Sequence, residues 1–259
     1  MNLCKEDPLS RRKHRPYNRA DQAQRNYSQN GNLKENIIDI NSYRKTTKKR
    51  VELLPKNLAQ ERYIDCLENT NINIVFACGY AGSGKTYLAT LYAIQCLKQG
   101  LCDKIVVSRP NIAVDDRDIG ALPGDIYKKM APWTKPVLDV FEEYFSVKEI
   151  TSMIEDNIIE LVPLAYIRGR TFKNSIIILD EAQNTTKSSM LSALTRIGEG
   201  SKMIITGDTR QSDRGKTNGL TDFLDRYINS ERITICYFDK TSVERHPVIG
   251  EILNLYGEE

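Results

Sequence analysis

Short apolar runs alternate with more polar segments over most of the chain after residue 55. The runs are rich in β-branched residues and predict buried strands; they read INIVFACG, KIVVSRP, NIIELVP, SIIILDE, KMIITGD and ITICYF. The segments PKNLAQERYIDCLENT, KTYLATLYAIQCLKQG, TKSSMLSALTRIGEG and GLTDFLDRYI predict helices. We expect the second helix to stop at Gly100 and the third at Gly198 or Gly200. Strands that alternate with helices predict an α/β fold, with a mainly parallel sheet and helices on both faces.

The stretch between the second and third predicted strands is too long for a simple connection. We expect loop and helix over 111–150, punctuated by Pro123, Pro132 and Pro136. Segment 109–145 is expected to contact substrate or a neighbouring subunit, through Arg109, Lys128, Lys129 and Trp133. The alternative is a helical cap that buries Trp133 in a small core of its own, and for Trp133 itself we prefer the cap.

Charge divides the chain into two parts. Residues 1–50 carry 13 basic and 5 acidic residues, a net of +8, whereas the whole chain has a net charge of +3. We therefore expect a basic, largely disordered arm and linker over 1–50, followed by a single domain over 51–259. The arm is either a solubilising tail or a nucleic-acid-binding segment, in which Tyr17 and Tyr27 stack on bases. The run NIIDI at 36–40 suggests a small docking strand.

Composition excludes several classes of protein. The six cysteines form no C-x-x-C pair and the chain has two histidines, which argues against a disulfide framework or a multi-histidine metal site. No apolar run approaches the length of a membrane span, and the N-terminus has no apolar signal region. We expect a cytoplasmic protein that does not bind membranes.

The octapeptide GYAGSGKT at 79–86 matches the phosphate-binding pattern G-x-x-x-x-G-K-[ST]. A predicted strand precedes it and a predicted helix follows it, which is the arrangement that the pattern requires. Lys85 is expected at the surface, reaching the β- and γ-phosphates of ATP, and Thr86 is expected to ligate Mg²⁺. The nucleotide-binding residues are Gly79, Tyr80, Ala81, Gly82, Ser83, Gly84, Lys85, Thr86 and Tyr87.

Two further polar elements follow predicted strands. Asp180 and Glu181 end the run IIILDE, so we expect Asp180 to hold Mg²⁺ through water and Glu181 to polarise the attacking water. Gln211, in TGDTRQ, is expected to hydrogen-bond the γ-phosphate or its water. Either element alone is compatible with ordinary surface charges or a plain turn.

The motifs together resemble a known family. DEAQN and GDTRQ resemble the second and third motifs of superfamily 1 helicases, and the fuller set is similar to the PhoH family of ATPases: GYAGSGKTYLA, SRPNI, IGALPGD, RGRTF, ILDEAQN, TGDTRQSD and ERHPVI. The resemblance covers about residues 55–256 and implies a RecA-like ATPase core that acts on RNA and forms rings. It also implies that Gln60 recognises adenine and that Arg245 contacts the γ-phosphate. Without it, Gln60 is an exposed helix residue and Arg245 pairs with Glu244 or another acidic residue.

One chain lacks a component that this chemistry needs. Only 48 residues follow GDTRQ, too few for the second domain from which helicases supply an arginine to the nucleotide. We therefore expect a homo-oligomeric ring, a hexamer by the resemblance, in which each neighbour supplies the arginine. Arg168 or Arg170, with Arg170 first, is the predicted residue; the alternative is that both pair with surface carboxylates. Two functions remain open: a nucleic-acid-stimulated, helicase-like ATPase acting on single-stranded nucleic acid, or a slow nucleotide-dependent switch that binds protein partners. A metabolite kinase is a third and weaker alternative.

Overall fold

The computed structural model of this chain describes residues 50–110, 126–213, 215, 217–244, 248 and 255, with the backbone alone for 126–131. All of these residues belong to the unit Asp39–Glu259. The predicted basic arm, apart from Arg50, and the predicted docking strand at 36–40 lie outside the described residues.

A six-stranded parallel sheet forms the centre of the described unit. The strands follow the order β3-β2-β4-β5-β1-β6, so the strand before GYAGSGKT lies beside the strands that end in TGD and ITICYF. Most strand residues are buried, which explains why the sequence shows continuous apolar runs rather than alternation. The strands are β1 (Ile74–Gly79), β2 (Lys104–Arg109), β3 (Ile159–Pro163), β4 (Ser175–Leu179), β5 (Lys202–Gly207) and β6 (Ile233–Phe238).

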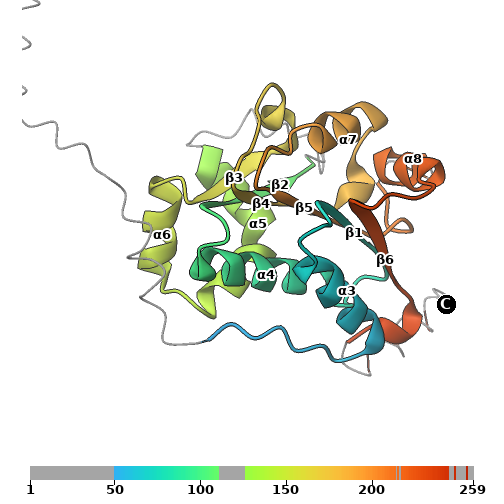
Figure 1. Ribbon diagram of the computed structural model, residues 1–259, viewed down its shortest axis with the longest axis horizontal. Coiled ribbons are helices and arrows are strands. Elements are labelled where there is room, and N and C mark those ends of the chain that lie inside the picture. The colour runs from blue at the N-terminus through green and yellow to red at the C-terminus, as the bar shows by residue number, and fades with distance from the viewer. Residues whose placement is uncertain are drawn as a thin grey trace, which may run out of the picture. The chain divides into compact units, whose positions relative to one another are not determined.

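Helices cover both faces of this sheet (Figure 1). One face carries α3 (Leu58–Glu68), α4 (Lys85–Gln99), α5 (Ile126–Glu142) and α6 (Val147–Glu155). The other carries α7 (Lys187–Leu194), α8 (Gly219–Arg226) and the short 3-10 turns η2 (Leu164–Ile167) and η3 (Ala182–Asn184); a further turn, η4 (Lys240–Ser242), follows β6. The predicted α/β fold is therefore confirmed.

Alternating strand residues fill two hydrophobic cores, one on each face. In β1, Val75 and Ala77 belong to the core under α3 and α4, whereas Phe76 belongs to the core under α7 and α8. Phe76 stacks on Phe223 of α8 with ring centroids 4.2 Å apart. The sheet is thus fixed from both sides, and its strand ends are held in place for the site described below.

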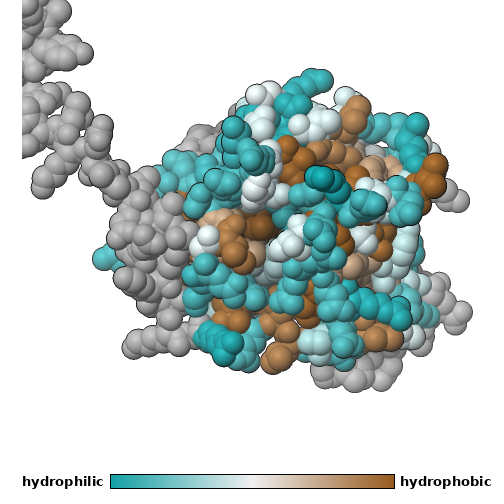
Figure 2. Space-filling model, in the orientation of Figure 1, coloured by the Kyte–Doolittle hydropathy of each residue, from teal (hydrophilic) through white to brown (hydrophobic). Residues whose placement is uncertain are grey.

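The visible surface in Figure 2 is mainly hydrophilic, with hydrophobic residues scattered over it. None of the helices in the described part of the chain is long and apolar enough to cross a lipid bilayer.

Two element boundaries differ from the sequence prediction. Helix α5 continues through Pro132 and Pro136, which lie on its exposed side, where water can bond the carbonyls that lack an N–H partner. Helix α7 ends at Leu194, before both glycines that were expected to cap it. It ends there because the following residues turn to pair with Phe172; the N–H of Gly198 donates to the Phe172 carbonyl at 2.7 Å.

Candidate nucleotide site

A cavity of about 310 Å³ lies at the carboxyl ends of β1, β5 and β4, which are neighbours in the sheet. It opens where β1 turns into α4 through the loop 79–84, whose glycines Gly79, Gly82 and Gly84 have positive φ angles. The N-terminus of α4 therefore faces the cavity, as an anion site requires. The lining residues are Ala81, Gly82, Gly84, Lys85, Thr86, Tyr87, Asp180, Glu181, Thr206, Gly207, Asp208 and Gln211.

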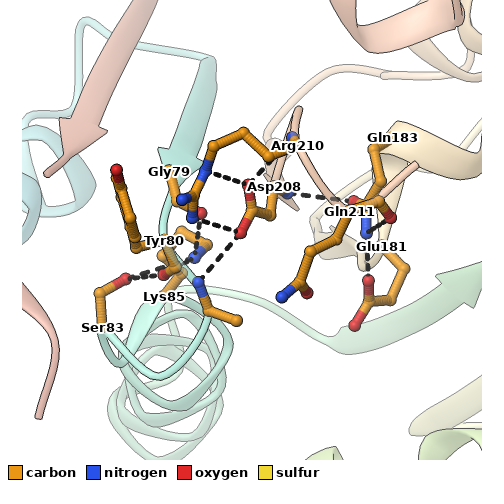
Figure 3. A network of polar contacts seen from close by, with 10 residues as sticks. Gly79, Tyr80, Ser83, Lys85, Glu181, Gln183, Asp208, Arg210 and Gln211 are labelled. Carbon is orange, nitrogen blue, oxygen red and sulfur yellow. Dashed lines mark hydrogen bonds and ion pairs between the residues drawn. The ribbon is translucent and has the colours of Figure 1, made fainter. Parts of the chain in front are cut away.

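Lys85 lies beneath the phosphate loop and not at the surface, where the sequence analysis placed it. It is 8% exposed, and its ammonium donates to the carbonyls of Gly79 at 2.8 Å and Tyr80 at 2.6 Å and to Ser83 Oγ at 3.2 Å (Figure 3). Burial lowers the pKa of Lys85 from its ordinary value, and the negative charge of Asp208 opposes that shift. The expectation failed because the loop curls over the side chain and encloses it.

Thr86 and Asp180 meet on the cavity wall although they are far apart in the sequence. Thr86 Oγ1 donates to Asp180 Oδ1 at 2.8 Å, and Thr206 Oγ1 donates to the same oxygen at 2.5 Å. Asp180 is buried, so these hydroxyls satisfy a carboxylate that water reaches poorly. A hydroxyl oxygen next to a carboxylate fits the oxygen ligands that Mg²⁺ prefers.

Glu181 follows Asp180 in a left-handed backbone conformation with φ of +54°. This conformation is unusual for a residue with a side chain and begins the turn η3. The carboxylate is held from two sides: Arg109 Nη2 lies 3.3 Å from Oε1, and Gln183 Nε2 donates to Oε2. Glu181 thus lines the cavity with a defined side-chain position.

The TGDTRQ loop joins the phosphate loop through Asp208. Its carboxylate accepts from the N–H of Ala81 at 3.1 Å and from the Arg210 side chain at 3.0 and 3.2 Å (Figure 3). The guanidinium of Arg210 stacks on the Tyr80 ring, 3.1 Å from its centroid. Gln211 stands at the cavity wall, and the Asp208 N–H donates to Gln183 Oε1 at 3.1 Å. Three motifs are therefore linked around one cavity.

Comparison with known proteins agrees with this geometry. The PhoH-like protein family matches residues 52–257, nearly all of the chain that follows the basic arm. The chain belongs to this family. A PhoH-like protein from Bacillus subtilis strain 168 is 39% identical over 206 residues, which are 79% of this chain and 64% of the relative. Protein PhoH from Escherichia coli K12 is 38% identical over 208 residues, 79% of this chain and 58% of the relative. This chain thus spans less than two thirds of the length of these curated relatives.

Similarity to solved structures is much weaker. The crystal structure of Pif1 helicase from Candida albicans matches with a TM-score of 0.36 at 13% identity, over 79% of this chain and 44% of that one. AMPPCP-bound DnaA from Aquifex aeolicus matches with a TM-score of 0.31 at 17% identity, over 78% and 52%. At these scores the likeness carries no functional information.

Gln60 and Arg170, two of the predicted site residues, are not among the described residues that line the cavity. Gln60 is 4% exposed beneath the phosphate loop, where its Nε2 donates to the Ser83 carbonyl at 3.0 Å and its Oε1 accepts from the Lys56 N–H. The alternative that it is an exposed helix residue is wrong, and its predicted contact with adenine stays a prediction. Arg170 forms a two-point ion pair with Glu160 at the amino ends of β2 and β3.

The remaining predicted residues are less informative. The alternative was that Arg168 and Arg170 both pair with surface carboxylates; Arg170 instead pairs with Glu160, which is buried, and its role in a neighbour's site stays a prediction. Arg168 is exposed. Arg245 and the side chains of Lys128 and Lys129 lie outside the described residues.

Sequence reasoning missed several side chains that organise the site. Asp208 and Gln183 link the motifs, but neither was among the predicted site residues; Asp208 directly follows β5, whereas Gln183 lies in η3, four residues beyond the end of β4. Arg109 was assigned only to a substrate-binding segment, whereas the structure places it against the carboxylate of Glu181. The end position of Arg109 on β2 was the available signal, because parallel strands end at one edge.

Proposed function

We propose that this PhoH-like chain is an ATPase that works with Mg²⁺ as an oligomeric ring and is stimulated by single-stranded nucleic acid, RNA in particular. The observation that carries the proposal is the cavity wall itself, where Lys85, Thr86, Asp180 and Glu181 meet. A cation, a metal-binding pair and a carboxylate base are the groups that ATP hydrolysis needs in one place.

Each residue has a separate part in this scheme. Lys85 exchanges its contacts with loop carbonyls for the β- and γ-phosphates, which accept stronger charge-assisted hydrogen bonds. Thr86 and Asp180 would hold Mg²⁺, which would supply positive charge to offset that of the phosphates. Glu181 accepts the proton of the attacking water, and Gln211 orients that water from the opposite loop.

The proposal of a ring rests on the number of cationic side chains that line the cavity. Lys85 is the one cationic side chain among the described residues that line it. A second cation speeds hydrolysis about 10³–10⁵-fold in other nucleotide hydrolases. Arg170 pairs with Glu160 at the opposite end of the strands, too far to serve its own cavity. This placement supports a role for a neighbour's arginine, and head-to-tail contacts that repeat close into rings.

The test compares ATP hydrolysis and nucleotide retention in wild type and Glu181→Gln. We expect wild type to hydrolyse ATP faster with single-stranded RNA than without it, and Glu181→Gln to bind ATP with Mg²⁺ but keep it unhydrolysed. Glu155→Gln, an exposed position at the end of α6, is the matched control and should behave as wild type.

The same assay separates the two functions left open by the sequence. Slow hydrolysis that neither RNA nor DNA accelerates would instead favour a nucleotide-dependent switch that binds protein partners. Hydrolysis by Glu181→Gln at the wild-type rate would contradict the role of this residue as the base. Light scattering with and without nucleotide measures whether the ring forms.

A further inference from the structure

Arg109 connects the candidate base to a helix outside the nucleotide cavity. It is the last residue of β2, and its side chain is 22% exposed. One end of its guanidinium lies 3.3 Å from Glu181 Oε1, while Nη1 donates to the backbone carbonyl of Trp133 in α5 at 2.8 Å. Nη1 also lies 4.0 Å from Asp180 Oδ2. A single planar group therefore spans the base and α5.

Each oxygen of the Glu181 carboxylate lies against a polar side chain: Oε1 forms an ion pair with Arg109, and Oε2 accepts a hydrogen bond from Gln183. Arg109 holds Oε1, and Gln183 holds Oε2, as Figure 3 shows for the glutamine. A water that is to give its proton to Glu181 must compete with these side chains for the lone pairs of the carboxylate. The guanidinium of Arg109 carries a full positive charge, whereas the amide of Gln183 is neutral, so Arg109 is the greater electrostatic restraint on the carboxylate.

Direct contact between Arg109 and phosphate is not favoured by this geometry. The described residues that line the cavity do not include Arg109, which lies beside the two carboxylates instead. The hydrogen bond from Arg109 Nη1 goes to the main chain of α5 and not toward the phosphate loop. Neutralising Asp180 and Glu181 does not require the hydrogen bond to the Trp133 carbonyl, so this bond indicates an additional role for Arg109.

We propose that Arg109 is a positioning residue that restrains Glu181 in the unstimulated enzyme and releases it when α5 moves. The inference rests on the ATPase function proposed above. Because Arg109 is anchored to the Trp133 carbonyl, a displacement of α5 draws the guanidinium away from Glu181 and frees Oε1 for water. RNA bound against α5 would thereby accelerate hydrolysis without touching the nucleotide.

The experiment measures kcat and KM for ATP in Arg109→Ala and Arg109→Lys, each with and without oligouridylate. Arg109→Ala should raise the basal kcat about fivefold, equivalent to about 1 kcal/mol of activation free energy. Its KM should stay within about twofold of wild type, and oligouridylate should add little further rate. Arg109→Lys should keep the low basal rate, because an ammonium still reaches Glu181, but lose stimulation, because one ammonium does not span both partners.

Control variants distinguish loss of the proposed restraint from misfolding and from failure of the ATPase proposal. Arg226→Ala removes an exposed arginine of α8, paired only locally with Asp222 in the contacts seen, and should match wild type. If Arg109→Ala does not fold, Arg109→Gln retains a donor for the Trp133 carbonyl without the charge and should still raise the basal rate. A basal kcat at or below wild type, or a large rise in KM, in the folded variant overturns the restraint. A wild type that does not hydrolyse ATP overturns the proposed function itself.

Discussion

Gly79→Ala is expected to destabilise this protein far more than a glycine substitution normally does. Gly79 ends β1, has a φ of +136°, and pairs in register with Phe238 of β6. A Cβ at this position would lie 1.9 Å from the Phe238 carbonyl oxygen, 2.7 Å from its carbon and 2.9 Å from its nitrogen. All three are main-chain atoms, so no side chain can rotate away to make room.

The magnitude follows from two separate costs. The backbone conformation itself costs an L-residue about 1–3 kcal/mol. The contact with Phe238 must open from 1.9 Å to about 3.0 Å, and forcing such a shift in packed structure costs about 1–3 kcal/mol more. The total is about 2–6 kcal/mol. The shift also strains the hydrogen bond from the Tyr80 N–H to the Phe238 carbonyl, which is 3.2 Å long and positions the phosphate loop.

Gly169→Ala provides the matched control. Gly169 has a φ of +78°, but an added Cβ there meets no atom of the described residues within 4 Å, so only the backbone cost of about 1–2 kcal/mol remains. Urea unfolding of both variants measures the difference, provided that the slope of the free energy with urea is unchanged. We expect Gly79→Ala to lose about 1–3 kcal/mol more of its free energy of unfolding than Gly169→Ala, which is the cost of the contact with Phe238. Equal losses would refute the argument that β6 excludes a side chain from the phosphate loop.

Three further predictions concern charge and assembly. Burial lowers the pKa of Lys202 to about 8; the unfolded chain therefore holds the proton in the window from pH 8 to about 10.4 while the folded chain loses it. The free energy of unfolding should accordingly rise with pH across that window, and the rise should be smaller in Lys202→Met when urea unfolding is followed at several pH values. Deleting residues 1–36 should leave basal ATP hydrolysis unchanged but weaken the dependence of RNA affinity on salt concentration. If that dependence does not change, the arm is a solubilising tail and does not bind nucleic acid. Mixing the inactive variants Lys85→Ala and Arg170→Ala after subunit exchange should restore activity, since some interfaces then combine an intact site with an intact arginine. If ATP hydrolysis does not recover, the arginine supplied by the neighbour is a residue other than Arg170.

The strands were predictable because each is a short, continuous apolar run, and all six predicted strands are confirmed. Parallel pairing then brings Asp180 and Thr206 to the same edge as the phosphate loop, so the meeting of Thr86 with Asp180 was implicit in the sequence. The periodicity of hydrophobic residues does not show which loop folds over which side chain. Lys85 and Gln60 are polar residues that local sequence places outside, yet the phosphate loop covers both.

The contacts of Glu181 were beyond sequence reasoning for a different reason. The distance from Arg109 to Glu181 depends on the register between β2 and β4, where Ser108 lies opposite Leu179. The anchor of Arg109 to α5 depends on a helix that continues through two prolines, where the sequence suggested interruptions. Both details arise from tertiary packing, which overrides local signals in many proteins.

Steady-state ATP hydrolysis by wild type and Lys85→Ala tests the central claim most directly. Lys98→Ala, a change on the same helix away from the cavity, serves as the control. Circular dichroism must first establish that Lys85→Ala folds, because its ammonium satisfies three oxygens of the loop. The account predicts ATP turnover by wild type and Lys98→Ala and none above background by folded Lys85→Ala. Turnover by folded Lys85→Ala at the wild-type rate would contradict it.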